Sequence, residues 1–293
     1  MSAGEFELIK KIKRWTQTDS RVVLGIGDDA AVLRSSRGRD ILFTTDMLIE
    51  GYHFRLSEAT PYEIGRKALA VNLSDMAAMG GLPTHAVAAL GLPKKLSGIF
   101  TKNLYRGLND LARRFHVNLV GGDTNRSDKL ILSVALLGEV EKGKAVRRSG
   151  ARVGDRIFVS GPLGGSYASR KHLNFIPRLK EARALVKNFD VHAMMDISDG
   201  LASDVRRLAE ASGVGVLLEE KSIPVSPHAK NVRQALTEGE DFELLFTVSE
   251  KEARPLIKKY HEVGRVVPKK EGVRLLKKNG RTVPLAGGFD HFK

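Results

Sequence analysis

Residues 60–81, "TPYEIGRKALAVNLSDMAAMGG", predict the helix on which the rest of the fold depends. Thr60 is a suitable N-cap, a proline suits the first helical position, and Glu63 completes a capping box. The two glycines at the end of the stretch predict where the helix stops. Asp75 lies well inside this helix, where a carboxylate among apolar neighbours gains little from capping. The presence of Asp75 therefore indicates that its carboxylate binds something other than the end of a helix.

Mixed strands and helices flank this helix in the first half of the chain. Short apolar runs predict strands, and one amphipathic stretch predicts a second helix. The strands are expected at 41–45, 84–92, 117–120 and 129–140, and the helix at 101–115. Strands outnumber helices, so this half predicts α+β layering.

The pattern restarts after "RRSGARVGD" at residues 147–155. A strand is expected at 156–161, and a later strand at 193–198 leads into a helix that Gly213 closes. Strands and helices then alternate toward the C-terminus, where an Asn-Gly pair predicts a hairpin. We therefore predict two domains. They are residues 1–147 and residues 148–293, the second of α/β type.

The composition is that of a soluble globular protein, with 42% hydrophobic and 28% charged residues in a chain of 293. No apolar run approaches the roughly 20 residues that span a bilayer, and the first residues lack the apolar core of a signal peptide. The absence of cysteine excludes disulfides, thiolate metal sites and cysteine nucleophiles. We expect a cytoplasmic protein without membrane contacts.

The net charge of +14 comes from 48 basic and 34 acidic residues. Such a charge suits nucleic acid, an anionic membrane surface or small anionic substrates. The basic residues occur in scattered groups with little aromatic interleaving, whereas proteins that bind single strands usually supply aromatic stacking platforms. The charge favours a solvated basic surface, and we predict no nucleic-acid partner.

Acidic residues recur where apolar runs end, and this is the main chemical signal in the sequence. Any one of them is commonly a turn or cap residue. Together, beside glycine and hydroxyl residues and without cysteine, they suit a hard cation bound through oxygen, such as Mg²⁺. The residues are Asp28, Asp29, Asp46, Asp123, Asp196 and Asp199, with Asp75 from the helix.

Asp28 and Asp29 are adjacent within "LGIGDDAAVL", residues 24–33. The pair indicates either a surface turn or a cation that needs both the geometry and the charge. Successive side chains of an extended chain point to opposite sides. The two carboxylates therefore need not form a single clamp.

Neither standard nucleotide loop is present, because the chain has no G-x-x-x-x-G-K-[ST] and no G-x-G-x-x-G after a strand. Two glycines before Asp123 allow backbone amides to approach a phosphate closely. If the protein binds ATP, it must hold the phosphates mainly through metal ions.

Nine segments, in order along nearly the whole chain, resemble the thiamine-monophosphate kinase family. That family belongs to the superfamily of aminoimidazole ribonucleotide synthetase and selenophosphate synthetase. The nine segments in this order are far more specific evidence for the family than any one segment alone. The segments are "GEFELI", "GIGDDAAVL", "TTDMLIEGYHF", "KALAVNLSDMAAMG", "LVGGDTNRS", "RRSGARVGD", "DISDGLASD", "GEDFELLFTV" and "GGFDHF".

The resemblance implies an aminoimidazole ribonucleotide synthetase-like fold. Its N-terminal α+β domain would dimerise through its sheet, and a C-terminal α/β domain would complete the cleft that holds ATP and several Mg²⁺ ions. The implied reaction is direct, Mg²⁺-assisted transfer of the γ-phosphate of ATP to thiamine monophosphate, giving thiamine diphosphate. It has no covalent intermediate and needs no catalytic nucleophile. The implied assembly is a homodimer.

The resemblance also implies three groups of site residues, carried over by position. The magnesium group is Asp29, Thr44, Thr45, Asp46, Asp75, Asp123, Asp196 and Asp199. The ATP group is Tyr105, Gly122, Asp123, Arg148 and Ser198. The group for thiamine monophosphate is His53, Glu240 and Phe289.

Several of these assignments have alternatives. His53 is a base, a group that orients the substrate phosphate, or a residue packed at a strand end. Glu240 provides a carboxylate near the cationic thiazolium or caps the next strand. Phe289 offers an aromatic face to that cation or belongs to the C-terminal core. Arg148 makes a bidentate phosphate contact or lies in a solvated loop.

Two departures from the family pattern concern the acceptor side. Residues 165–195 are short relative to the family's helical insert, and Tyr52 stands where a small polar residue is more familiar. The nearest alternative function is that of another ATP-dependent synthetase or kinase of the superfamily. The lack of cysteine disfavours the selenophosphate and hydrogenase-maturation enzymes. A non-catalytic nucleic-acid-binding protein is more distant, because the acids would repel phosphates.

Overall fold

The helix predicted from the capping signature is α2, Pro61–Ala78. The Thr60 hydroxyl accepts a hydrogen bond from the Glu63 amide, and the Glu63 carboxylate accepts one from the Thr60 amide, so the capping box is complete. Most of α2 is buried, as expected of a helix with neighbours on every side. The computed structural model describes residues 7, 9, 10, 13, 15, 18–35, 38–96 and 98–288.

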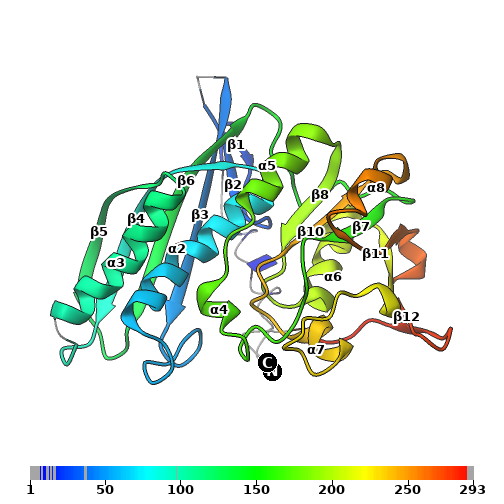
Figure 1. Ribbon diagram of the computed structural model, residues 1–293. Helices are drawn as coiled ribbons and strands as arrows, with labels where there is room; N and C mark the ends of the chain where they lie inside the picture. Colours follow the sequence, from blue (N-terminus) through cyan, green and yellow to red (C-terminus); the bar gives the residue numbers. More distant parts are fainter. Residues whose placement is uncertain are drawn as a thin grey trace.

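The first half of the chain forms a six-stranded sheet of order β1-β2-β3-β6-β4-β5. Neighbouring strands are antiparallel except β4 and β5. Helices α2 and α3 (Gly98–Arg114) cover one face of this sheet (Figure 1). The strands are β1 (Val22–Leu24), β2 (Ala31–Arg34), β3 (Arg39–Ile49), β4 (Leu82–Leu92), β5 (Asn118–Arg126) and β6 (Ile131–Glu141).

Strands β3 and β5 are longer than the sequence predicts. β3 pairs with β6 as far as Ile49, and β5 pairs with β4 as far as Arg126. Asp46 and Asp123 therefore lie within strands, and the expectation that they follow strand ends is wrong. The ladder hydrogen bonds extend each strand past its apolar run, because pairing does not require apolar side chains. Asp196, in contrast, is the last residue of its strand.

Helices α2 and α3 cross at a pair of glycines. A Cβ added at Gly65 of α2 would stand 1.9 Å from the carbonyl oxygen of Leu104 in α3. A Cβ added at Gly107 of α3 would stand 1.9 Å from the carbonyl oxygen of Tyr62 in α2. The two backbones thus approach more closely than any larger residue permits.

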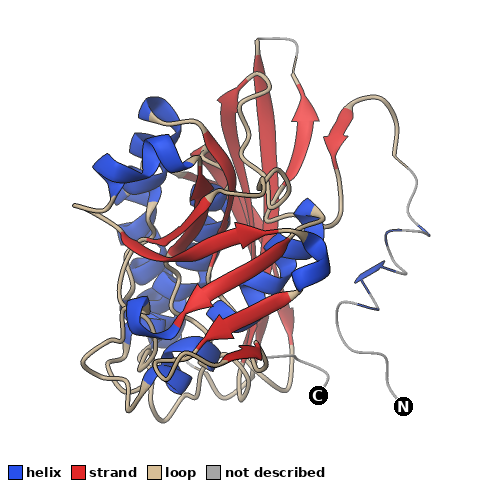
Figure 2. Ribbon diagram, turned by 90° about the vertical axis from the view of Figure 1, so that its right-hand side faces the viewer, coloured by secondary structure: helices blue, strands red, loops and turns tan. Residues whose placement is uncertain are grey.

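The second half forms a seven-stranded sheet of order β13-β12-β9-β11-β7-β10-β8. Its pairs are antiparallel except β9 and β12. Figure 2 shows the strands of the two sheets running in different directions. The strands are β7 (Arg156–Val159), β8 (Val191–Asp196), β9 (Gly215–Glu219), β10 (Leu244–Val248), β11 (His261–Val267), β12 (Val273–Leu276) and β13 (Thr282–Pro284).

The helices of the second half are α4 (Lys171–Asn174), α5 (Leu179–Asn188), α6 (Leu201–Ser212), α7 (Val232–Thr237) and α8 (Glu250–Leu256). Two 3₁₀ turns, Glu220–Ser222 and Lys269–Glu271, complete the described elements. Gly213 closes α6 in the left-handed conformation, at φ 69°, as the sequence predicts.

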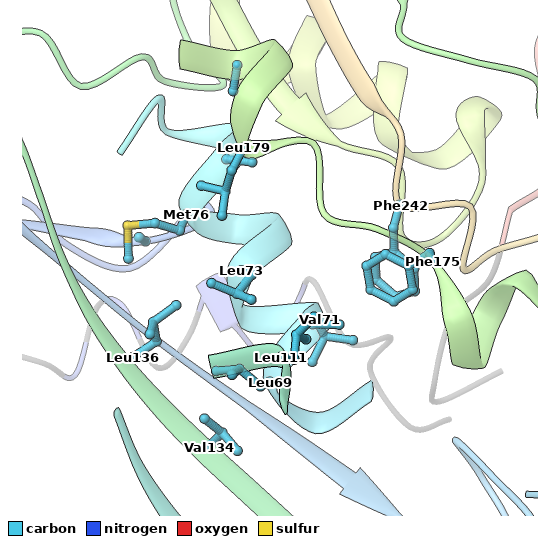
Figure 3. Close-up of a cluster of buried hydrophobic side chains, with 14 of the residues drawn as sticks. Leu69, Val71, Leu73, Met76, Leu111, Val134, Leu136, Phe175, Leu179 and Phe242 are labelled. Carbon is cyan, nitrogen blue, oxygen red and sulfur yellow. The ribbon is translucent and has the colours of Figure 1, made fainter. Parts of the chain in front are cut away.

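Helix α2 joins the two halves. It packs on β3 and β6 of the first sheet and also contacts α4, α5 and β8. Figure 3 shows Leu69, Leu73 and Met76 of α2 within one buried cluster that includes residues of both halves. Phe175 and Phe242 stack at the edge of this cluster with ring centroids 4.0 Å apart.

The architecture is the two-domain α+β fold that the sequence predicts. The predicted boundary between residues 147 and 148 lies in the segment that connects β6 to β7, and the boundary itself stays a prediction. Among the described residues, no helix is both long and apolar enough to cross a membrane.

Candidate active site

A cavity of about 970 Å³ is lined by residues from both halves of the chain. Its walls come from the β1–β2 loop, β3, α2, the segment before β7, the end of β8, α6 and the loop before β10. Most of the site residues expected from the sequence line it. They are Asp29, Thr44, Thr45, Asp46, His53, Asp75, Arg148, Asp196, Ser198, Asp199 and Glu240.

Three carboxylates meet in this cavity. Asp29, Asp75 and Asp196 each have an oxygen atom within 4.8 Å of the others. The Thr44 hydroxyl donates to Asp75 Oδ2 at 2.6 Å, and the Ser74 hydroxyl donates to Asp196 Oδ2 at 2.5 Å. The atoms that could bind a metal ion here are all oxygen atoms, which are the ligands that Mg²⁺ prefers in proteins.

Burial and mutual repulsion disfavour the charges of this cluster. Burial, with the charges of Asp46, Asp196 and Asp29, raises the pKa of Asp75 well above its usual value. Burial and the charge of Asp29 raise the pKa of Asp196 to about 7. Burial also raises the pKa of Asp46, although a hydrogen bond with Asp75 opposes this. A divalent cation would relieve the repulsion.

Asp28 and Asp29 have different partners. The Asp28 carboxylate accepts hydrogen bonds from the backbone amides of Asp29 and Arg148. The Asp29 carboxylate accepts from Arg148 Nη2 at 2.6 Å and from Arg148 Nε at 3.1 Å. Asp28 therefore fixes the loop, while Asp29 and the Arg148 guanidinium face the cavity as an ion pair.

A second group of charges lies beside the cluster, at the start of α6. Arg207 forms ion pairs with Asp199 at 2.5 Å and with Asp204 at 2.8 Å. The Asp204 carboxylate also accepts the Asp199 amide. Burial raises the pKa of Asp204 well above its usual value, although Arg207 opposes the shift. This group fixes the loop that carries Ser198 and Asp199.

His53 and Glu240, two of the residues expected to bind the acceptor, lie together and are joined by Lys67 of α2. Lys67 Nζ donates to Glu240 Oε2 at 2.6 Å and to the His53 carbonyl oxygen at 2.8 Å. His53 Nδ1 accepts the Ile49 amide, so the neutral ring carries its proton on Nε2. That nitrogen can donate a hydrogen bond to an anion.

A smaller cavity of about 300 Å³ adjoins the main one on this side. Tyr52, His53 and Tyr167 line both cavities. The Tyr167 ring packs on His172, with centroids 4.4 Å apart. Tyr52, one departure from the family pattern, and Tyr167, from the short segment 165–195, therefore lie near His53.

Four predicted residues do not line the cavity or cannot be placed. Tyr105 is half-buried on α3 and packs against the hydrophobic core. Gly122 and Asp123 are exposed on β5, at the edge of the six-stranded sheet. Phe289 lies outside the described residues.

The sheet register separates Asp123 from the carboxylate cluster. Asp46 pairs with Val134, Val134 with Ala88, and Ala88 with Gly122, so Asp46 and Gly122 share one row. Three strand spacings of about 4.8 Å put them roughly 14 Å apart. Within one chain, Asp123 does not join the cluster.

Sequence reasoning missed four polar residues of the site. Lys67 gave a signal, since a lysine within an apolar helix calls for a buried partner, and Ser74 stands next to Asp75. Asp204 and Arg207 are three residues apart on α6, the spacing of helical ion pairs. Only the fold shows which carboxylates these residues contact.

Two family descriptions match the chain. "AIR synthase related protein, N-terminal domain" matches residues 27–140, and the corresponding C-terminal domain matches residues 152–277. Similar curated proteins include the thiamine-monophosphate kinase of Bacillus subtilis (strain 168), which is 36% identical over 99% of both chains. That of Aquifex aeolicus (strain VF5) is 35% identical over 99% of this chain and 98% of its own.

Solved structures of thiamine-monophosphate kinases are also similar to the chain. The chain matches the structure titled "AaThiL complexed with AMPPCP and TMP" with a TM-score of 0.88 and 34% identity, covering 100% of this chain and 99% of that one. It matches the thiamine monophosphate kinase from Aquifex aeolicus with a TM-score of 0.81 and 33% identity, covering 97% and 100%. The hydrogenase maturation protein HypE of E. coli, at 22% identity and a TM-score of 0.73, shares the fold.

Proposed function

Since the chain belongs to the thiamine-monophosphate kinase family, within the AIR synthase related proteins, we propose that it phosphorylates thiamine monophosphate with ATP. The products are thiamine diphosphate and ADP. The observation that carries this function is the full-length match to a structure titled with AMPPCP, an ATP analogue, and TMP. The cavity brings together five of the expected metal-binding acids, all but Asp123, and two of the expected acceptor residues, His53 and Glu240.

Mg²⁺ is the proposed metal, and the side chains present fit it. Asp29, Asp75 and Asp196 provide clustered carboxylate oxygens without a competing nitrogen or sulfur ligand. Asp46 and Asp199 line the same cavity and extend the acidic surface. When bound, the ions neutralise the charge that develops on the transferred phosphoryl group.

The remaining task of the chain is positioning. One oxygen of the acceptor phosphate attacks the γ-phosphorus, the bond from that phosphorus to the bridging oxygen breaks, and ADP leaves. The acceptor is already anionic, so the reaction needs no general base and no protein nucleophile. Arg148 offers a planar donor pair to ATP, His53 Nε2 offers a donor to the acceptor phosphate, and Glu240 offers a carboxylate to the thiazolium cation.

A direct assay tests this function. Purified protein is incubated with Mg²⁺, ATP and thiamine monophosphate, and both products are separated and quantified. We expect thiamine diphosphate and ADP in equal amounts, and neither when thiamine monophosphate is omitted. ADP formation that requires a different acceptor would keep the superfamily assignment and overturn the substrate. A cytoplasmic location, where ATP is available, stays a prediction.

Mg²⁺ binding is expected to tighten as the pH rises from 6 to 8. The pKa of Asp196 in the folded chain is about 7, so below that pH Mg²⁺ must displace a proton. The dissociation constant should fall by up to about tenfold per pH unit for each proton displaced. Calorimetric titration at constant ionic strength measures it. Asp196→Asn should bind Mg²⁺ more weakly and with a smaller pH dependence.

The raised pKa of Asp196 also determines how the stability of the protein without Mg²⁺ changes with pH. The Asp196 pKa is higher in the folded chain than its ordinary value of 3.8, so the folded state holds this proton more tightly than the unfolded state. Its contribution therefore favours folding at low pH and is lost as the pH rises from about 4 to 7. In the Mg²⁺ titration, an affinity that is equal at pH 6 and pH 8 would contradict the assignment of Asp196 to the metal.

Arg148→Ala is expected to raise the KM for ATP by about 10- to 100-fold, as loss of a charged hydrogen-bonding contact worth about 1.5–3 kcal/mol predicts. The KM for thiamine monophosphate should change little. Arg147→Ala is the matched control, because this neighbouring arginine does not line the cavity. An unchanged KM for ATP in the Arg148 variant would remove this residue from the ATP site.

We also propose a homodimer formed through the uncovered face of the six-stranded sheet. Phe43 and Leu137 pair on this face, and both are exposed, at 44% and 38%. Met47 and Val87 are exposed at 52% and 42%. By register, Asp123 shares the row of Met47, so a second copy packed on this face would cover it. Apolar side chains gathered on one sheet face are typical of an interface.

Val87→Glu should convert the dimer to a monomer, because it places a charge on this face. Its cross-strand neighbours are Ala135 and Gly121, which leave no partner for a buried carboxylate. Light scattering of the eluting protein gives the mass. Ile99→Glu is the control, since Ile99 is 74% exposed on α3, over the opposite face. A wild-type monomer at micromolar concentration would contradict the proposed dimer.

A further inference from the structure

Lys67 is a fully buried cation at the junction of the two halves. Its Nζ donates to the Glu240 carboxylate at 2.6 Å and to the His53 carbonyl oxygen at 2.8 Å. Burying an ammonium group is costly unless it is paired and hydrogen-bonded. Lys67 meets this need with the two described residues that were expected to bind thiamine monophosphate.

Glu240 is held in a constrained conformation. Its φ of 63° lies in the left-handed region that residues other than glycine rarely adopt. The Glu240 amide donates to the Ser198 carbonyl oxygen at 2.6 Å. The next residue, Asp241, accepts from the Gly164 amide and from the Ser166 hydroxyl. The backbone is thus fixed, and Lys67 fixes the carboxylate at the end of the side chain.

His53 is fixed from two directions. The Ile49 amide donates to Nδ1 of the ring at 3.0 Å, and Lys67 binds the carbonyl oxygen of the same residue. One side chain from α2 therefore sets the backbone of His53 and the carboxylate of Glu240 at once. No exposed surface of Lys67 remains for direct contact with a substrate.

We infer that Lys67 is the positioning residue of the acceptor side, holding Glu240 and His53 in the arrangement that receives thiamine monophosphate. The inference rests on the proposed function, because it assigns the acceptor to these two residues. Ordering both groups before the substrate arrives reduces the entropy lost on binding. The role is therefore specific to the acceptor and leaves ATP binding unaffected.

The test is Lys67→Met, which keeps most of the unbranched side chain and removes the charge and the donors. We expect the KM for thiamine monophosphate to rise by about tenfold or more, because contacts to charged groups are lost. The KM for ATP should stay within about twofold, as should the Kd for Mg²⁺ with AMPPCP. Thermal unfolding is followed in parallel, because a merely structural lysine would alter stability alone.

Arg66→Met is the matched control. Arg66 precedes Lys67 on α2 and is a half-buried cation that, like Lys67, binds carbonyl oxygens, in its case those of Leu173 and Phe175. It contacts neither His53 nor Glu240. We expect Arg66→Met to lower the melting temperature without changing the ratio of the two KM values.

A double-mutant cycle with Glu240→Gln tests whether Lys67 acts through its partner. In the double variant, the fold-increase in the KM for thiamine monophosphate should be well below the product of the fold-increases in the two single variants. Fully multiplicative effects would overturn this coupling. An unchanged KM for thiamine monophosphate in Lys67→Met, or a change equal to that of Arg66→Met, would overturn the inference.

The proposed function can fail separately. A wild-type protein that forms no thiamine diphosphate refutes the function before any variant is made. A wild-type protein that does form it, with a Lys67→Met variant that behaves like Arg66→Met, refutes only the role of Lys67.

Discussion

Replacing Asp75 by asparagine is expected to lower kcat at saturating Mg²⁺ by about a hundredfold to a thousandfold while the fold stays intact. Asparagine has the shape of aspartate, and its amide oxygen can still accept the Thr44 hydroxyl that Asp75 accepts at 2.6 Å. The variant removes one of the three carboxylates that lie within 4.8 Å of one another. A bound metal contributes several kcal/mol to transition-state stabilisation, and each 1.36 kcal/mol is worth about tenfold in rate.

The same variant should raise the melting temperature in the absence of Mg²⁺. Burial and three neighbouring carboxylates raise the pKa of Asp75 well above its usual value, so its charge opposes folding. A neutral side chain removes that repulsion. Increased stability together with lost activity separates a metal-binding carboxylate from a residue that only supports the fold.

Asp40→Asn is the control for both measurements. Asp40 is a buried carboxylate on the same strand as Asp46, but it accepts the Gly143 amide and does not line the cavity. We expect this variant to lose stability and keep kcat. Turnover close to wild type in Asp75→Asn at saturating Mg²⁺ would refute the assignment of Asp75 to the metal.

Gly65→Ala is expected to lower the free energy of unfolding by about 3 kcal/mol or more, at the upper end for overpacking. The added Cβ would stand 1.9 Å from the carbonyl oxygen of Leu104. A backbone atom cannot move aside as a flexible side chain can, so α2 and α3 must separate. Urea unfolding followed by circular dichroism measures the change.

Gly98→Ala is the control in the same pair of helices. A Cβ at Gly98, the first residue of α3, meets no atom within 4 Å. This variant should be neutral or slightly stabilising, since alanine favours the helix. A Gly65→Ala protein as stable as wild type would show that the helices do not cross as closely as the structure has them.

Features encoded by adjacent residues were predictable from the sequence. The capping box before α2 and the left-handed Gly213 after α6 are local signals with a direct physical cause. The aspartates that line the cavity were found from their recurrence beside glycine and hydroxyl residues. The resemblance to a known family added the roles that are expected of them.

Features that depend on partners distant in the chain were not predictable. The extension of β3 through Asp46 comes from pairing with β6, almost ninety residues later. The separation of Gly122 from the cluster follows from a strand order that places β6 and β4 between β3 and β5. The partners of Lys67 come from a turn and a loop that meet only in the folded chain.

Helix α2 sets the distance between the proposed acceptor site and the proposed metal site. Lys67 and Asp75 are eight residues apart on one helix, so about 12 Å of rigid backbone separates the proposed anchor of the acceptor from the proposed metal-binding carboxylate. Movement of one sheet relative to the other does not alter this spacing, because both residues belong to the same element. We therefore expect this fixed length to contribute to discrimination between thiamine and thiamine monophosphate.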